Sequence, residues 1–495
     1  QKICAVFTGE GGTSEGDFHE ALNVASVWKL PVLFCVENNG YGLSTPTSEQ
    51  FNCENIADKG IGYGMESHVI DGNNIIEVYS KVSELAESVR QNPRPILLEF
   101  KTFRMRGHEE ASGTKYVPQE LMDAWAAKDP LENFQAYLRA ENILTEEDEV
   151  QFKEAIVHEI NEHLQMAFDE PAITVDLETE INDVFKAFQP EIINPSTETK
   201  KIRLIDAISD GLRQSMEQHD DLVIMGQDIA EYGGAFKITD GFVAQFGKDR
   251  VRNTPICESA IVSAAYGLSI NGMKSVMEMQ FADFVSSGFN PIVNLLAKSQ
   301  YRWSQIADVV VRMPCGAGVG AGPFHSQTNE AWFTHTPGLK VVYPSNPHDA
   351  KGLLLASFED PNPVLFFEHK GMYRNISASV PSDHYTVEIG KASVVNEGNA
   401  ATIITYGMGV QWAMDLVKTK NQDIEVIDLR SLAPIDYDAI SNSVKKTNKV
   451  LILHEDSLVG GIGGEISAYI SEHLFEYLDG PVLRCASLDT PVPFA

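Results

Sequence analysis

Two short apolar runs near the start of the chain, joined by a helical pattern, constrain the fold more than any other feature. The runs, residues 3–7 and 32–36, have the length of buried strands. Between them, apolar residues recur at helical spacing, namely Phe18, Ala21, Leu22, Ala25 and Trp28. This pattern predicts a strand–helix–strand unit, whose crossover is almost always right-handed and returns the second strand parallel to the first. The turns after the two strands then lie at one carboxyl edge of a parallel sheet, where open α/β folds bind ligands.

Both of these turns carry oxygen ligands. Residues 9–12 read Gly-Glu-Gly-Gly, and residues 38–41 read Asn-Asn-Gly-Tyr. Glu10, Asn39 and the backbone carbonyl of Tyr41 are hard oxygen ligands of the kind that Mg2+ prefers, with phosphates and water completing an octahedron. The alternative is that Glu10 is only an acid near a helix N-terminus and that the Asn-Asn-Gly segment is an ordinary turn.

Composition limits the classes of protein to consider. A chain of 495 residues is too long for one hydrophobic core, so we expect two or three domains. The net charge of −32 argues against nucleic acid or an anionic membrane as a partner and would suit docking to a basic protein surface. The sequence has no apolar run of roughly 18 residues and no secretory signal, so we expect a cytoplasmic protein. Its cysteines form no Cys-x-x-Cys pair, which predicts neither a zinc site nor disulfides: Cys4, Cys35, Cys53, Cys257, Cys315 and Cys485.

The chain divides into three α/β blocks. We expect domains at residues 1–167, 201–380 and 381–495, because short apolar strands alternate with helical patterns in each. Residues 168–200 carry three prolines and many acids, which is typical of an interdomain linker. Residues 145–170 read as a helix with one apolar stripe. The stripe consists of Phe152, Ile156, Ile160 and Leu164.

A second candidate group lies in the middle of the chain. Glu258 lies between a predicted strand and an Ala-rich helix that ends at Asn271-Gly272. The alternative to a functional role is that Glu258 is only an acid in the first helical turn, where the helix dipole favours a negative charge. His108 and His325 each lie in a polar loop flanked by glycine, which makes them candidates for general acid/base catalysis. The glycines at 316–322 lack the G-x-G-x-x-G frame and its helix, so we exclude a dinucleotide-binding loop there.

Taken together, these segments resemble the thiamine-diphosphate-dependent decarboxylating component of 2-oxo-acid dehydrogenase complexes, with α-type and β-type subunits fused in one chain. The α-type resemblance rests on Gly-Glu-Gly-Gly-Thr-Ser-Glu-Gly-Asp (9–17), Glu-Asn-Asn-Gly-Tyr (37–41) and Arg-Met-Arg-Gly-His (104–108). The β-type resemblance rests on Thr-Pro-Ile-Cys-Glu (254–258), Gln-Phe-Ala-Asp-Phe (280–284), His-Ser-Gln (325–327), Pro-Gly-Leu-Lys-Val-Val (337–342), Asp-Leu-Arg-Ser-Leu-Ala-Pro (428–434) and His-Glu-Asp (454–456).

The resemblance implies a transketolase-like multidomain α/β fold, with a diphosphate-binding domain (1–167), a pyrimidine-binding domain (201–380) and a C-terminal domain (381–495). It also implies thiamine diphosphate and Mg2+ as cofactors. The implied metal ligands are Glu10, Asn39 and the Tyr41 carbonyl. The implied cofactor-binding residues are Gly9, Glu10, Gly11, Gly12, Asn39, Tyr41, Glu258, Gln280 and Phe284.

The same resemblance implies the reaction. Glu258 would activate the aminopyrimidine ring of the cofactor, and His108 and His325 would handle the 2-oxo acid and the incoming lipoyl disulfide. The reaction would be decarboxylation of a 2-oxo acid followed by reductive acylation of a lipoyl group on the acyltransferase component. In relatives the cofactor lies between the α-type domain of one unit and the β-type domain of its partner, so a homodimer of the fused chain is expected.

The substrate is less constrained than the reaction. Most of the superfamily has Asp where this chain has Glu10, and branched-chain 2-oxo-acid dehydrogenases share the Glu, which favours 3-methyl-2-oxobutanoate. A pyruvate or acetoin dehydrogenase of the same family is the alternative, because pocket shape decides such preferences. A transketolase-type enzyme would not fit the β-type part. A non-catalytic scaffold is disfavoured because Glu10, Asn39, Glu258, His108 and His325 are all present.

Three departures from the family pattern qualify these expectations. Glu109 replaces the serine on which kinases act in animal relatives, so we do not expect that regulation. The loop 109–118 lacks the usual Ser/Thr-Asp pattern, which leaves substrate contacts there open. Both ends look like cuts through a longer protein, and the upstream α-type portion supplies an arginine to the diphosphate in the family. We therefore expect this chain alone to bind the cofactor poorly.

Overall fold

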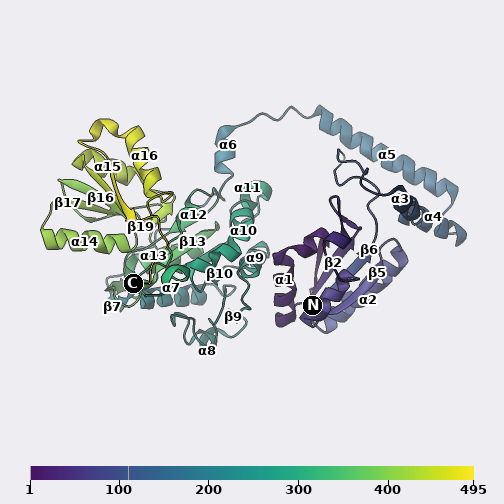
Figure 1. Ribbon diagram of the computed structural model, residues 1–495, viewed down its shortest axis with the longest axis horizontal. Helices are drawn as coiled ribbons and strands as arrows, with labels where there is room; N and C mark the ends of the chain where they lie inside the picture. Colours follow the sequence, from purple (N-terminus) through teal and green to yellow (C-terminus); the bar gives the residue numbers. More distant parts are fainter. Residues whose placement is uncertain (1, 110, 495) are drawn as a thin grey trace. The chain divides into compact units, whose positions relative to one another are not determined.

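The computed structural model describes residues 2–109 and 111–494 and divides into two compact units, residues 1–175 and 176–495. Strands and helices alternate along both units (Figure 1). The sheets are mainly parallel and flanked by helices, which confirms the expected α/β class. Within the described ranges, every helix falls short of the length and apolar character that a membrane crossing requires.

Unit 1 is built on a four-stranded parallel sheet in the order β1-β2-β6-β5. Its strands are β1 (Cys4–Gly9), β2 (Val32–Asn38), β5 (Glu66–Asp71) and β6 (Ile96–Lys101), with a short antiparallel pair β3 (Tyr41–Gly42) and β4 (Thr45–Pro46). Its helices are α1 (Gly16–Trp28), α2 (Ile75–Gln91), α3 (Gln119–Ala126), α4 (Pro130–Ala140) and α5 (Glu146–Asp169). The succession β1–α1–β2 confirms the predicted strand–helix–strand unit.

Helices cover both faces of this sheet, because successive strand residues point to opposite faces. The cluster on the α2 face includes Leu33, Cys35, Ile96, Leu98, Leu85 and Val89. The cluster on the α1 face includes Phe34, Val36, Leu97, Leu22 and Ala25. The two cores hold the carboxyl ends of β1 and β2 in fixed register, with Gly9 opposite Glu37.

Helix α5 confirms the helix predicted over 145–170, but its apolar stripe is not buried. The helix begins with a capping box between Thr145 and Asp148 and has no buried residue. The side chains of the stripe are between 48% and 60% exposed: Phe152, Ile156, Ile160 and Leu164. The helical periodicity therefore predicts the element correctly, and the structure shows its apolar stripe half-exposed.

Unit 2 contains two larger sheets. The seven-stranded sheet has the order β18-β12-β13-β11-β10-β8-β9, and all its pairings are parallel except that of β18. Its strands are β8 (Val223–Gly226), β9 (Val251–Asn253), β10 (Ser275–Glu278), β11 (Val309–Cys315), β12 (Lys340–Val342), β13 (Val364–His369) and β18 (Ser431–Ala433). The helices of this part are α6 (Leu177–Asn182), α7 (Leu204–Gln218), α8 (Phe242–Phe246), α9 (Glu258–Ile270), α10 (Phe289–Pro291), α11 (Ser299–Trp303), α12 (Ala331–Thr334) and α13 (Pro347–Glu359).

The second sheet of unit 2 has five strands in the order β15-β17-β16-β19-β20. They are β15 (Ser393–Asn396), β16 (Ala401–Thr405), β17 (Ile424–Asp428), β19 (Val450–Ser457) and β20 (Leu483–Ser487), with helices α14 (Met408–Lys420), α15 (Tyr437–Thr447) and α16 (Gly463–His473). A separate antiparallel pair joins β7 (Thr199–Arg203) to β14 (Ser377–Pro381). Because β18 comes from the same C-terminal stretch as these five strands yet pairs with β12, that stretch adds an edge strand to the larger sheet.

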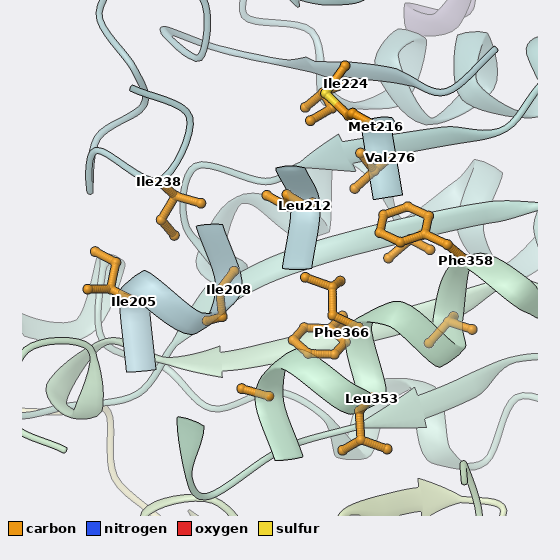
Figure 2. Close-up of a cluster of buried hydrophobic side chains, with 14 of the residues drawn as sticks. Ile205, Ile208, Leu212, Met216, Ile224, Ile238, Val276, Leu353, Phe358 and Phe366 are labelled. Carbon is orange, nitrogen blue, oxygen red and sulfur yellow. The ribbon is translucent and has the colours of Figure 1, made fainter. Parts of the chain in front are cut away.

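The core of the larger sheet lies between α7, α13 and the strands (Figure 2). The apolar residues of α7 recur three or four positions apart, which puts them on one helix face. They are Ile205, Ile208, Leu212 and Met216, and they cluster with Leu353, Phe358, Phe366 and Val276. Each fully buried side chain of this size contributes about 1.5–3 kcal/mol, so this core fixes the strand ends that carry the candidate site.

The segment predicted as a linker is partly ordered against unit 2. It includes α6, and the Lys186 N–H donates to Asn362 Oδ1 (2.8 Å), while Asn362 Nδ2 donates to the Lys186 carbonyl (3.0 Å). Further along, the Ile193 N–H donates to Thr386 Oγ1 (3.0 Å). Backbone groups in this segment therefore have fixed partners, which its proline and acid content does not reveal.

Candidate functional site

One candidate site lies at the carboxyl edge of the unit 1 sheet. Glu10 follows β1 directly, and Asn39 follows β2. The Asn39 N–H donates to Glu10 Oε2 (2.9 Å), so the structure brings these two residues together as the parallel register requires. Glu10 is only 2% exposed, and it caps the one-turn helix Gly11–Ser14.

The Glu10 carboxylate has no cationic partner among the residues that the structure describes. No Lys, Arg or His nitrogen of these residues pairs with it, and no hydrogen bond from them reaches Oε1. A buried carboxylate without a counterion is costly. The environment of Glu10 is therefore one that a bound cation would stabilise.

Two further oxygens are available beside Glu10. Asn39 Oδ1 accepts a long hydrogen bond from the Tyr41 N–H (3.4 Å). Tyr41 faces Pro46 in the β3–β4 pair, and the adjacent bond runs from the Thr47 N–H to the Gly40 carbonyl (3.1 Å). This pattern makes Tyr41 a member of a non-hydrogen-bonded pair, so its own carbonyl points away from β4.

These oxygens fit a hard divalent cation. Carboxylate, amide and backbone oxygens are ligands that Mg2+ accepts when phosphate and water complete its shell. Within residues 2–109 and 111–494, no three His, Cys, Asp or Glu side chains converge as a metal site. A metal at Glu10 would therefore depend on the Asn39 amide and on backbone oxygen.

The glycines around Glu10 differ in what surrounds them. A Cβ at Gly12 would lie 2.4 Å from Thr8 Oγ1, and a Cβ at Gly11 would lie 3.3 Å from Gly42 Cα. A Cβ at Gly9 would meet no atom within 4 Å. Packing therefore explains Gly11 and Gly12, whereas the space beside Gly9 is open to a ligand.

Asn38 is held by a residue that sequence reasoning missed. Asn38 Nδ2 donates to Glu99 Oε1 (2.7 Å), and the Ala57 N–H donates to Glu99 Oε2 (3.0 Å). The Lys101 ammonium also pairs with Glu99, at 2.6 Å. Glu99 thus fixes the Asn38 turn from the centre of β6, and its signal in the sequence is an acid inside an apolar strand.

The segment that carries His108 packs on the turn after Asn39. Arg104 donates through Nη2 to the Leu43 carbonyl, and the Tyr41 ring contacts the rings of Phe103 and Tyr116 at centroid distances of 6.4 and 5.7 Å. His108 itself is exposed, with Nδ1 3.5 Å from Arg104 Nη1. His108 is therefore a solvent-accessible imidazole in the segment that packs on this turn.

A second candidate site lies in unit 2, at the start of α9. Glu258 is the first residue of this helix and is buried, and Gln227 Nε2 donates to its Oε1 atom (3.1 Å). Gln280 Nε2 donates to Asp228 Oδ2 (3.1 Å). Because Gln227 and Asp228 are consecutive residues after β8, Glu258 and Gln280 are tied to the same turn. Sequence reasoning missed Gln227, which stands directly after an apolar strand.

An aromatic cluster surrounds His325. Its ring lies 4.9 Å from the Phe281 ring and 5.6 Å from the Phe284 ring, both edge-on, and the two phenylalanines lie 5.6 Å apart. The structure thereby brings His325 and Phe284 together, as expected for one site. Phe281, which the sequence analysis did not select, supplies the closer ring contact.

A buried charge network links three neighbouring strands of the seven-stranded sheet, β10, β11 and β13. Arg312 is 0% exposed, and it pairs through Nη1 with Glu278 (2.5 Å) and through Nε with Glu368 (2.7 Å). The Tyr373 hydroxyl donates to Glu368 as well (2.6 Å). Although burial opposes it, the two carboxylates raise the pKa of Arg312 further above its ordinary value. The guanidinium is therefore a permanent charge that holds β10, β11 and β13 together.

The two units carry different functional groups. Unit 1 presents buried oxygen ligands beside open space at Gly9, together with the exposed imidazole of His108. Unit 2 presents a buried carboxyl at a helix start and the imidazole of His325 among aromatic rings. The groups of unit 1 suit metal-assisted anion binding, and those of unit 2 suit proton transfer.

Comparisons with known families cover both units. Residues 1–176 match the family described as the dehydrogenase E1 component. Residues 200–375 match the pyrimidine-binding domain of transketolase, and residues 390–495 match the transketolase C-terminal domain.

Individual relatives are 2-oxo-acid dehydrogenase subunits. The chain is 45% identical to the 2-oxoisovalerate dehydrogenase subunit beta of Bacillus subtilis over 299 residues, which cover 59% of this chain and 91% of the relative. It is 38% identical to the subunit of the same name from Pseudomonas aeruginosa over 327 residues, 62% of this chain and 93% of the relative. It is 40% identical to the pyruvate dehydrogenase E1 component subunit beta of Staphylococcus aureus over 299 residues, 59% of this chain and 92% of the relative. The chain therefore belongs to the thiamine-diphosphate-dependent E1 family of 2-oxo-acid dehydrogenases.

Proposed function

We propose that this protein decarboxylates a branched-chain 2-oxo acid oxidatively and transfers the resulting acyl group to a lipoyl group of an acyltransferase partner. The observation that supports the substrate assignment is the 45% identity to the Bacillus subtilis 2-oxoisovalerate dehydrogenase subunit, while the Pseudomonas aeruginosa subunit of the same name (38%) and the pyruvate dehydrogenase subunit (40%) are about equally similar to this chain. Glu10 also points in this direction, because the family resemblance associates a glutamate at this position with branched-chain members.

The unit 1 residues are assigned to metal and diphosphate. Glu10, Asn39 and the Tyr41 carbonyl would hold Mg2+, because Glu10 is buried without a cationic partner beside the two other oxygens. The turn 9–12 would receive the diphosphate, with Gly9 leaving the space for it. The chemistry supplied by the bound cofactor is a carbon nucleophile and an electron sink for decarboxylation.

The unit 2 residues are assigned to the ring of the cofactor and to proton transfer. Glu258 would orient the aminopyrimidine and hold a proton at its carboxyl, while Phe284 and Gln280 bind around the ring. His325 contacts the Phe281 and Phe284 rings edge-on, which would orient its imidazole for proton transfer. His108 would act from the exposed loop on the substrate or the lipoyl group.

The proposal extends to the assembly. The chain would carry an α-type domain (1–167), a linker (168–200), a β-type pyrimidine domain (201–380) and a C-terminal domain (381–495), and it would work as a homodimer in a complex with a lipoylated acyltransferase. The support is that residues 1–176 match one E1 family model while later residues match two transketolase models.

The test is a comparison of substrates with the full-length protein. Decarboxylation of 3-methyl-2-oxobutanoate and of pyruvate would be measured with thiamine diphosphate, Mg2+ and a dye acceptor. We expect kcat/KM to favour the branched acid by about 10-fold or more, since differences of a few methyl groups give discrimination of that order. Preference for pyruvate would leave the proposed mechanism unchanged but identify the protein as a pyruvate dehydrogenase, the second candidate function. Turnover of neither acid would contradict the proposal.

A further inference from the structure

The loop that carries His325 is closed at its base and held at both ends. The Gly316 N–H donates to the Gln327 carbonyl (2.9 Å), which closes residues 316–327 into a loop. Four glycines of this loop have positive φ angles, so its backbone has little intrinsic preference for one shape. Contacts outside the loop must therefore fix the position of His325.

The first contact comes from the C-terminal sheet. Glu455 lies on β19, and its Oε1 atom accepts from the Ala317 N–H (2.7 Å). Its Oε2 atom accepts from His369 Nε2 (2.6 Å), while His369 Nδ1 accepts from the Gly371 N–H (3.1 Å). Because Nδ1 is an acceptor, the ring carries its proton on Nε2 and donates it to Glu455. Burial opposes ionisation of Glu455, but hydrogen bonds from His369 and Ala317 outweigh it and hold the pKa of this carboxyl below its usual value.

The start of the loop has no room to move toward His369. A Cβ at Gly316 would lie 2.2 Å from two atoms of the His369 ring. The ring that donates to Glu455 therefore also packs directly on the first residue of the loop.

The second contact holds the other end of the loop. Asp283, a buried residue between Phe281 and Phe284, accepts through Oδ1 from the Gln327 N–H (3.0 Å). The aromatic cluster around His325 and the end of its loop thus share one anchor.

A buried lysine stands among these carboxylates. Lys370 is 4% exposed, and its ammonium makes no hydrogen bond with any described residue. It lies 5.6 Å from the Phe281 ring centroid. Burial lowers the pKa of Lys370, against the opposing effect of Cys315, Asp283 and Glu455. This cation favours the ionised forms of the two carboxylates that hold the loop.

We propose that Glu455 of the C-terminal domain is a positioning residue for His325, acting through the Ala317 end of the loop. The C-terminal domain thereby sets the geometry of the active-site loop in addition to packing on the larger sheet. The part of this inference that concerns catalysis rests on the role of His325 in the proposed function, whereas the restraint on the loop does not.

The test uses Glu455→Gln in the full-length protein and begins with hydrogen exchange. Glutamine keeps the size but places an NH2 group against either the Ala317 N–H or the His369 N–H. Loss of one charge-assisted hydrogen bond predicts about 10-fold or more faster exchange in residues 316–327. The matched control is Glu425→Gln, a buried carboxylate in the same domain that pairs with Lys446 and makes no hydrogen bond to the loop. Unchanged exchange in the loop, or an equal change in the control, would overturn the proposal.

Activity then shows whether the loop acts through His325. We expect Glu455→Gln to lower kcat about 10-fold with little change in KM, and to cause no further loss when His325 is already alanine. Additive losses in that double variant would overturn the positioning role. If the wild type turns over no 2-oxo acid, the proposed function fails while the exchange test still decides the restraint. If Glu455→Gln does not fold, Glu455→Asp keeps the charge but shortens the reach, and the same exchange measurement applies.

Discussion

Replacing Arg312 with methionine gives the sharpest test of the energetics under the site. Methionine fills much of the aliphatic volume but removes the guanidinium that Glu278 and Glu368 share. Two buried carboxylates then face each other without a cation, and uptake of one proton is the least costly relief. Burial already raises the pKa of Glu278 even beside Arg312, so we expect the proton there.

The magnitude follows from the cost of that proton. At about pH 7.5, protonating a carboxyl of ordinary pKa near 4.5 costs about 4 kcal/mol, at about 1.4 kcal/mol for each pH unit. This value agrees with the roughly 3–5 kcal/mol lost when one partner of a buried ion pair is removed. The folded variant binds a proton that the unfolded chain does not, so its deficit relative to wild type grows as pH rises and shrinks toward pH 5.

The assay is urea unfolding followed by tryptophan fluorescence at about pH 6 and pH 7.5. We expect a loss near 4 kcal/mol at the higher pH and near 2 kcal/mol at the lower one. The control Arg203→Met removes a half-exposed guanidinium paired with Asp206 and should cost less than about 1 kcal/mol. A loss for Arg312→Met below about 1.5 kcal/mol, or one independent of pH, would refute the reasoning.

Three further predictions concern single carboxyl groups. Glu258→Gln should abolish decarboxylation while circular dichroism shows an intact fold, because an amide cannot hold the transferred proton; retained turnover would remove Glu258 from the mechanism. Glu10→Gln should weaken Mg2+-dependent binding of thiamine diphosphate by about 10-fold or more in calorimetry, since it removes the only acidic ligand proposed for the metal; an unchanged Mg2+ dependence would contradict the assignment. Burial, reinforced by Asp349, raises the pKa of Asp428 to about 7, so this carboxyl should contribute a loss of stability as pH rises from about 4 to 7. In urea unfolding, the stability of Asp428→Asn relative to the wild type should therefore increase over that pH range, and a difference independent of pH would contradict the raised pKa.

Much of the candidate site in unit 1 could be predicted from the sequence. The lengths of the runs 3–7 and 32–36 and the helical spacing between them predict β1–α1–β2, and parallel pairing then places Glu10 and Asn39 at one edge. The structure joins these residues by the hydrogen bond from the Asn39 N–H to Glu10. The prediction succeeds because each step depends on residues close in sequence.

The partners of the polar residues could not be read in the same way. Gln227 and Glu258 are hydrogen-bonded across 31 positions, and Asn38 and Glu99 across 61. Such pairs depend on strand order, since neighbouring strands in a sheet are seldom distinguishable by their composition. Glu99 is an acid within an apolar strand, which predicts that its carboxylate is buried with a polar partner. The sequence does not show which residue that partner is.

By itself, the sequence predicted local elements such as β1–α1–β2 and proposed candidate residues for the chemistry, because periodicity and turn composition act over a few neighbours. It also predicted α5, but not that the face of Phe152 and Ile156 remains exposed, since burial of a helix face depends on what packs against it. Only the tertiary structure decided that Glu455 on β19 holds the loop of His325 across 138 positions from Ala317. The physical reason is that Glu455 can reach the Ala317 N–H only after the two sheets of unit 2 have packed together. That packing depends on core residues far from both positions in the sequence, so no local pattern around Glu455 or Ala317 predicts the contact.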